Sequence, residues 1–164
     1  MITNSPSEKI IKQAREIAEA IFKSAEDPNQ MPINEESWKK LKKLSGDSLL
    51  YKIDEKENLL SWVVTIPTST ELMEKFLAKE ITEKELFEQT KPGMKYDTLY
   101  LCTIVTNPEY RNKGYAKEVT LDAIKRFEKI KDLKVFAWLT SKEGLNLARN
   151  LEKEAGRKIY LRID

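Results

Sequence analysis

The chain has 164 residues, with 29 basic and 27 acidic side chains, so its formal net charge at pH 7 is only +2. This balance gives no general electrostatic reason to expect a nucleic acid or a membrane surface as a partner. The length fits a single domain over residues 1–164 with its own hydrophobic core. Because Cys102 is the only cysteine and there is no histidine, an internal disulfide is excluded and no protein metal site is expected.

The N-terminus and the longest apolar run bear on targeting. Residues 1–6 lack the basic and apolar regions of a signal peptide. The longest apolar run, near residues 59–66, is too short to cross a bilayer. We therefore expect a soluble, cytoplasmic protein without a membrane partner.

The first part of the chain predicts two helices. Residues 5–8 (Ser-Pro-Ser-Glu) are a typical helix start, with proline at the first helical position and a capping-box glutamate. Apolar residues then recur at helical spacing from Ile10 to Ile21. A second helix is predicted from about Asn34 to Ser45. The chain therefore begins with a helix, and no strand is predicted before it.

Two strands and a helical segment follow. The runs 48–53 and 59–66 are apolar enough for central strands, and a charged turn joins them. Residues 67–97 contain two short helical patterns, the second starting with the capping box Thr82-x-x-Glu85. This segment is either a cover over an acceptor pocket or a packing or dimerisation element.

The most informative stretch runs from Thr98 to Ala116. A β-branched and aromatic strand ends at Asn107-Pro108, and a long amphipathic helix begins near Gly114. The first N–H groups of a helix lack intrahelical partners and carry the positive end of its dipole. A strand, a tight turn and a helix start that is rich in glycine and basic residues therefore predict a pyrophosphate site.

The C-terminal part predicts a strand at 133–139, a helix capped by Thr140-x-x-Glu143 and ended by Gly156, and a last strand at 158–163. The crossover that starts at Thr98 predicts a mixed sheet with helices on its faces.

The pattern Arg-x-x-Gly-x-Ala, read here at 111–116, resembles the coenzyme A signature of the GNAT family of N-acetyltransferases. The order of elements from residue 48 onward also resembles that family. The resemblance implies an α/β (α+β) fold with a mixed, mostly antiparallel sheet, here with N-terminal helices and a helical insertion before the signature strand. In relatives the pantetheine arm lies between this strand and the next.

The resemblance implies contacts to acetyl-CoA for the following residues. The pantetheine arm would contact Ile104, Val105 and Thr106. The pyrophosphate would contact Arg111, Asn112, Lys113, Gly114, Tyr115 and Ala116, and Lys117 would add positive charge. Asn146 is a further candidate contact, one position away from the family asparagine.

The final helix departs from the family pattern. Glu152 stands where many relatives have the tyrosine that protonates the departing thiolate. A glutamate acts as an acid only where burial raises its pKa, and the alternative is a solvated helix residue.

The catalytic side chains are less clear than the coenzyme site. Tyr100 stands where some relatives place a glutamate base, so it is the catalytic candidate, and the alternative is a core tyrosine. By strand alternation Tyr100, Cys102 and Ile104 are expected on one face. Cys102 lacks the histidine that would activate a covalent acyl carrier, which favours a buried thiol. Trp62 and Trp138 are expected in the core, with a lining role for one of them as the alternative.

The sequence therefore predicts direct transfer of an acetyl or other short acyl group from acetyl-CoA to an unidentified amine. The alternative is a GNAT-like protein that binds acyl-CoA without turnover and acts as a sensor or partner. A nucleic-acid module has little support, because basic and acidic residues are interleaved. An open sheet edge would favour a homodimer.

Overall fold

The structure is a computed structural model that describes residues 1–22, 27–32, 34–139 and 141–163. These residues form a six-stranded sheet in the order β1-β2-β3-β4-β5-β6. The strands are β1 (Ile2–Thr3), β2 (Leu49–Ile53), β3 (Leu59–Thr68), β4 (Thr98–Thr106), β5 (Lys134–Trp138) and β6 (Ile159–Arg162). Neighbours from β1 to β4 are antiparallel, whereas β5 is parallel to both β4 and β6. The predicted mixed sheet is confirmed, and the two predicted central strands, β2 and β3, are both flanked on each side.

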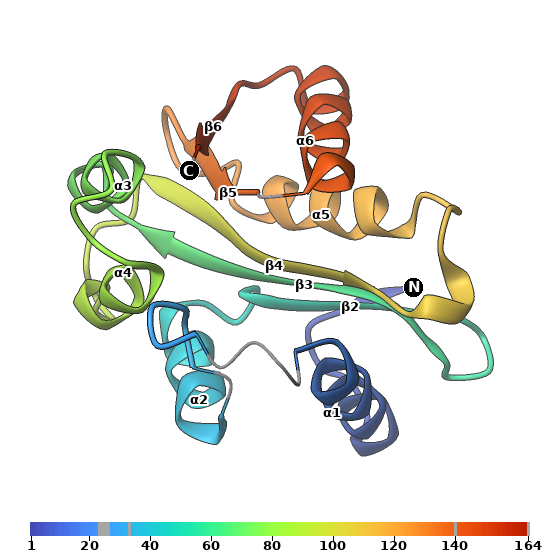
Figure 1. Ribbon diagram of the computed structural model, residues 1–164. Helices are drawn as coiled ribbons and strands as arrows, with labels where there is room; N and C mark the ends of the chain where they lie inside the picture. Colours follow the sequence, from blue (N-terminus) through green and yellow to red (C-terminus); the bar gives the residue numbers. More distant parts are fainter. Residues whose placement is uncertain (23–26, 33, 140, 164) are drawn as a thin grey trace.

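Helices cover both faces of this sheet (Figure 1). They are α1 (Glu8–Phe22), α2 (Glu35–Leu44), α3 (Thr70–Leu77), α4 (Glu83–Gln89), α5 (Tyr115–Arg126) and α6 (Lys142–Ala155). Side chains of α1 to α4 join one apolar cluster with Trp62, Tyr100 and Phe136 of the sheet. Side chains of α5 and α6 pack on the opposite face against Leu99 and Leu101. Alternate residues of β4 therefore contact different helices, as the pleat of a strand requires.

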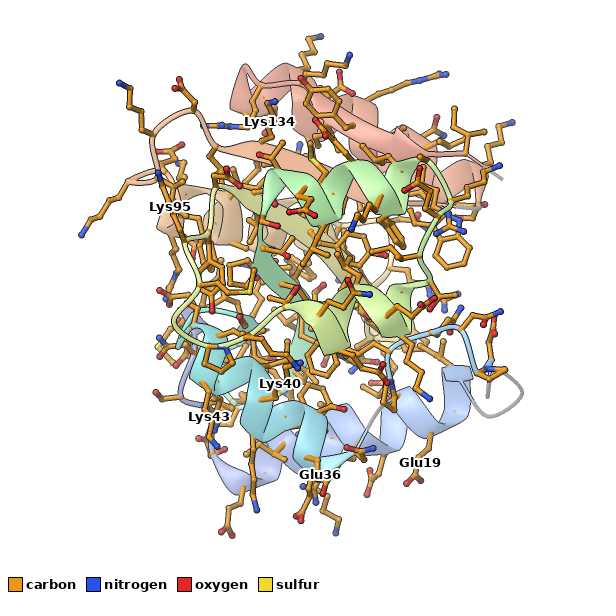
Figure 2. All side chains as sticks on the ribbon, turned by 90° about the vertical axis from the view of Figure 1, so that its left-hand side faces the viewer. Glu19, Glu36, Lys40, Lys43, Lys95 and Lys134 are labelled. Atoms are coloured by element: carbon orange, nitrogen blue, oxygen red, sulfur yellow. The ribbon has the colours of Figure 1, made fainter. Side chains whose placement is uncertain are left out.

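The segment before β4 folds as two capped helices, as predicted. The Ser69 hydroxyl accepts a hydrogen bond from the Leu72 N–H at 3.2 Å, and Thr82 and Glu85 form a reciprocal capping box. Figure 2 views α3 and α4 from the front, where they lie across the end of the central strands. Phe76 of α3 is fully buried and packs against the rings of Tyr100 and Phe136, which stack on each other. The insertion is therefore part of the core.

The first residues differ from the prediction in two ways. Ile2 and Thr3 form β1, which pairs with β2 through Ile2↔Lys52 and Thr3↔Tyr51. Two residues are too few to show a strand period, so only pairing with β2 defines this strand. The helix α1 begins at Glu8, with the Ser7 hydroxyl accepting from the Ile10 N–H at 3.4 Å. The cap is therefore Ser7, and Pro6 lies before the helix rather than at its first position.

The start of α6 also corrects the prediction. The Ser141 hydroxyl caps this helix by accepting from the Gly144 N–H at 3.0 Å. Thr140, the predicted cap, lies outside the described residues. At the other end Gly156 is left-handed, with φ of 61°, which confirms the predicted helix stop. Among the described residues, no helix is long and apolar enough to cross a membrane.

Candidate coenzyme and acyl-transfer site

Strand β4 keeps its parallel neighbour for only half of its length. The described residues of β5 pair with β4 from Thr98↔Lys134 to Leu101↔Ala137. Beyond Leu101, β4 continues to Thr106 and stays paired with β3 on its other side. This second half of β4 therefore has backbone donors and acceptors along one edge that β5 does not pair.

The backbone groups along this edge can be assigned by alternation. The Asn107 N–H donates to the Leu60 carbonyl at 2.9 Å, so the backbone of Asn107 faces β3. In an antiparallel ladder successive residues alternate between the two neighbouring strands. Ile104 and Thr106 therefore direct their N–H and C=O groups toward the edge of β4 that β5 does not pair. Val105 faces β3 instead, where its carbonyl accepts a hydrogen bond from the Ser61 hydroxyl at 2.6 Å.

Asn107 fixes the loop that follows β4. Its side-chain amide donates to the Leu59 carbonyl at 2.8 Å, and its side-chain oxygen accepts from the Glu109 N–H at 3.2 Å. The short 3-10 turn Pro108–Tyr110 begins directly after it. Asn112 then takes a left-handed backbone conformation, with φ of 64°, which asparagine tolerates better than most residues. The loop is thus held against the start of β3 and returns to α5.

The start of α5 carries free backbone donors. Gly114 is its N-cap, with φ of 78°, and it has no side chain to cap the helix. The first intrahelical bond runs from the Glu118 N–H to the Gly114 carbonyl. The N–H groups of Tyr115, Ala116 and Lys117 consequently have no intrahelical partner. A Cβ atom added to Gly114 would meet no protein atom within 4 Å, so the space above this backbone is open.

Basic side chains surround the helix start. Arg111 is exposed, the Lys113 ammonium lies 5.8 Å from the centre of the Tyr110 ring, and Lys117 pairs with Glu154 of α6 at 2.7 Å. The nearby acid Glu118 is neutralised by Lys52 at 2.6 Å. Positive side chains and the helix dipole therefore act in the same direction, which suits a diphosphate.

Asn146 and Glu152, the two candidate residues of the final helix, both lie on α6. Asn146 is an exposed residue near the start of α6, and it lies roughly 12 Å along the helix axis from Glu154, given a rise of about 1.5 Å per residue. Glu152 is half-buried near the C-terminal end of α6, where its backbone carbonyl accepts from Gly156. The loop 111–117 is one continuous group of candidate residues, and Asn146 lies on another element, α6.

A β-bulge at Cys102 changes the faces of β4. The ladder pairs Leu101 with Thr65 and Thr103 with Val64, so Cys102 has no partner on β3. The prediction that Ile104 shares a face with Tyr100 and Cys102 is therefore wrong. Ile104 packs on the α5 side, whereas Tyr100 and Cys102 pack with α3 and α4. One extra residue shifts every later side chain to the opposite face.

A buried carboxylate, which no pattern in the sequence indicates, lies behind the bulge. Glu83 is the first residue of α4 and only 7% exposed. One carboxylate oxygen accepts from the Tyr100 hydroxyl at 2.7 Å and lies 3.6 Å from the Cys102 sulfur. The other oxygen accepts from the Met31 N–H at 2.7 Å. Glu83 thus joins the insertion, β4 and the segment before α2.

Burial sets the protonation of this cluster. It raises the pKa of Glu83, although the hydrogen bonds from Met31 and Tyr100 act in the opposite direction. Burial and then the charge of Glu83 raise the pKa values of Tyr100 and Cys102 well above their ordinary values. Tyr100 therefore remains a phenol that donates a hydrogen bond. Cys102 remains a thiol, which agrees with a buried strand cysteine and not with an acyl carrier.

The raised pKa of Glu83 makes folding stability depend on pH. A carboxyl group whose pKa is raised by folding stabilises the protein below its unfolded pKa, and this contribution is lost as pH rises through the folded value. The free energy of unfolding of wild type relative to Glu83→Gln is therefore expected to fall as pH rises from about 4.5, the ordinary value, through the raised pKa. Urea unfolding of both proteins across this range measures the difference. A constant difference would contradict the raised pKa.

The surrounding side chains are mainly aromatic. The guanidinium of Arg162, at the end of β6, lies 4.7 Å from the ring centres of both Phe76 and Trp138, and it donates to the Ile81 carbonyl at 3.1 Å. Trp138 packs partly buried against this core, and Trp62 is 2% exposed within it, as expected. Arg162 places a positive charge on the same side of β4 as Glu83 and Tyr100.

Comparison with known families agrees with this geometry. The model of the acetyltransferase (GNAT) family matches residues 12–156. The chain therefore belongs to the GNAT acetyltransferase family, whose members use acetyl-CoA. No curated protein sequence matches the chain.

Two solved structures share the fold. The Arabidopsis thaliana NAA60 structure in complex with acetyl-CoA is 13% identical and has a TM-score of 0.60, with 93% of this chain and 84% of that chain covered. A tetramutant of the BH1408 protein from Bacillus halodurans is 14% identical and has a TM-score of 0.50, with 96% and 93% covered. At these identities the likeness shows the fold alone, and it confirms the predicted α/β GNAT-like architecture.

Proposed function

We propose that this protein transfers an acetyl group from acetyl-CoA directly to a primary amine. Membership of the GNAT family supports the reaction class. The observation that carries the proposal is the uncapped start of α5 at Gly114, next to a β4 edge that β5 does not pair. The two features offer backbone donors to a diphosphate and to an amide-bearing arm, and coenzyme A has both groups.

The residues present fit this co-substrate. In the proposal, the N–H groups of the loop and first turn, with Arg111 and Lys113, bind the pyrophosphate. The outward backbone groups of Ile104 and Thr106 bind the pantetheine amides. Val105 contributes by pairing with β3 and so keeping the edge straight. Asn146 is left as an exposed candidate at the start of α6.

The proposed reaction is direct attack by the amine. Holding the thioester and the amine together supplies much of the acceleration. Backbone N–H groups of β4 beyond Leu101 are available to stabilise the oxyanion. A covalent enzyme intermediate is not invoked, because the Cys102 thiol has a raised pKa and a carboxylate neighbour that opposes its ionisation.

Two measurements test the proposal. Calorimetric titration of acetyl-CoA and desulfo-CoA into the protein is expected to give micromolar dissociation constants. Incubation with acetyl-CoA and a panel of amines (spermidine, free lysine, kanamycin and a peptide with a free N-terminus) is expected to give an acetylated product by mass spectrometry. Binding without any product would favour the alternative of a coenzyme-binding sensor. No binding to folded protein would contradict both functions.

The acceptor, the compartment and the assembly remain predictions. The balanced net charge does not select among the amines of the panel. Strand β6 forms one edge of the sheet in the described residues, so a homodimer that pairs this edge remains a hypothesis.

A further inference from the structure

Glu83 lies at the point where β4 and β5 separate. It contacts Tyr100, one residue before the last residue of β4 that pairs with β5, and Cys102, one residue after it. A carboxylate on an inserted helix therefore reaches the bulge, where the β5-facing edge of β4 becomes available. In the proposed function the acyl group of the coenzyme must lie beside this edge.

The surroundings of Glu83 provide no ion-pair partner for its carboxylate among the described residues. Tyr100 and Cys102 of β4 face Glu83 as neutral donors. The negative charge of Asp27, from the segment before α2, raises the pKa of Glu83. The positive charge of Arg162, on β6, lowers the pKa of Tyr100. In the described residues no salt bridge involving Glu83 is found. Burying such a carboxylate is costly.

A purely structural role does not require an acid here. A glutamine could accept from the Met31 N–H through its oxygen, and its amide could donate to the Tyr100 hydroxyl, without a charge to bury. Ionisable groups that are kept at a cost in stability are concentrated at functional sites. Position and chemistry thus both favour a role in proton transfer.

We propose that Glu83 is the general base of the acetyl transfer and that Tyr100 is the positioning residue that holds its carboxylate; this rests on the proposed function. Glu83 takes the proton of the acceptor ammonium, directly or through one water. The freed amine lone pair forms the C–N bond at the thioester carbon. The C–S bond then breaks, and the remaining excess proton on nitrogen passes to the thiolate. Glu83 finally releases its proton to solvent, so the products are the amide, free coenzyme A and one proton.

The test compares Glu83→Gln with Glu88→Gln, a control on the exposed side of the same helix. With the best amine of the panel, Glu83→Gln is expected to lower kcat about 100-fold or more, the usual size of a general-base contribution. The dissociation constant of acetyl-CoA is expected to stay the same. Wild type and Glu88→Gln are expected to share a rising acidic limb of kcat/KM against pH, and Glu83→Gln is expected to lose it.

A second readout does not depend on turnover. In protein with ¹³C-labelled glutamate side chains, the carboxyl signal that disappears in Glu83→Gln belongs to Glu83. Its pKa is expected to coincide with the acidic limb of the wild-type profile in the free enzyme. In Tyr100→Phe the carboxylate loses a donor, so both the NMR pKa and the limb are expected to move to higher pH.

The outcomes separate this inference from the proposed function. Failure of wild type to bind acetyl-CoA or to acetylate any amine would overturn the proposed function and this inference with it. Normal binding and turnover in wild type, with kcat and the pH profile unchanged in Glu83→Gln, would overturn only the inference. If the acidic limb of kcat/KM persists in Glu83→Gln, or does not move in Tyr100→Phe, the general base is another group and the inference is overturned.

Discussion

Replacing Gly114 with glutamate is expected to weaken acetyl-CoA binding at least about 100-fold, or about 2.7 kcal/mol. The new side chain would enter the open space above the start of α5, where the proposal places the diphosphate. Two like charges 4 Å apart repel by about 1 kcal/mol in water and about 4 kcal/mol at the effective dielectric of a protein surface. Calorimetric titration of acetyl-CoA measures the loss.

The chain offers a matched control for backbone strain. Gly114 has φ of 78°, so any side chain there adds a left-handed strain of about 1–2 kcal/mol. Gly93 has φ of 85° and also has open space around its added Cβ atom. It lies between α4 and β4, away from the loop 111–117. Gly93→Glu is therefore expected to lose similar stability but to keep full acetyl-CoA affinity. Equal affinity losses in both variants would indicate strain, not a diphosphate site.

Truncation of Phe76 to alanine is expected to have the largest effect on stability, a loss of about 3–5 kcal/mol in the free energy of unfolding. Phe76 is fully buried, and its ring lies 5.0 Å from Tyr100, 6.0 Å from Phe136 and 6.1 Å from Trp138 between ring centres. Its removal would leave a cavity between α3 and the two strands that separate at the site. Urea unfolding measures this loss.

An exposed residue of the same helix provides the control. Glu74→Ala is expected to change the free energy of unfolding by less than about 0.5 kcal/mol, because Glu74 is exposed on α3. Equal small effects in both variants would mean that α3 is a loosely attached insert. A large effect of Phe76→Ala alone would establish that the insertion stabilises the core on which Tyr100 and Trp138 lie.

Local signals account for what was predicted correctly. Helices α2 to α6 follow from apolar spacing and short-range caps such as Thr82 with Glu85. The strand, turn and helix start around Gly114 were also predicted, because the left-handed glycine and its basic neighbours lie within a few residues of one another. These features depend on contacts over about four residues, so a single sequence records them.

Errors arose where a cap had several candidates or where a strand was very short. Ser7 and Ser141 form the caps, whereas the predicted caps were Ser5, two residues earlier, and Thr140, one residue earlier. The two residues of β1 become a strand only through pairing with β2, some fifty residues later. Neighbouring hydroxyls offer similar local energies, so tertiary packing selects among them.

The sequence by itself therefore determined the family-like order of elements from β2 onward and the candidate diphosphate loop. Only the tertiary structure decided the second half of the site. The bulge at Cys102 depends on its register against β3, and it moves Ile104 to the other face of the sheet. The cluster of Glu83 with Tyr100 and Met31 joins residues 17 and 52 positions apart. Such contacts arise from cross-strand register and burial, which no local pattern encodes, because both depend on segments distant in the chain.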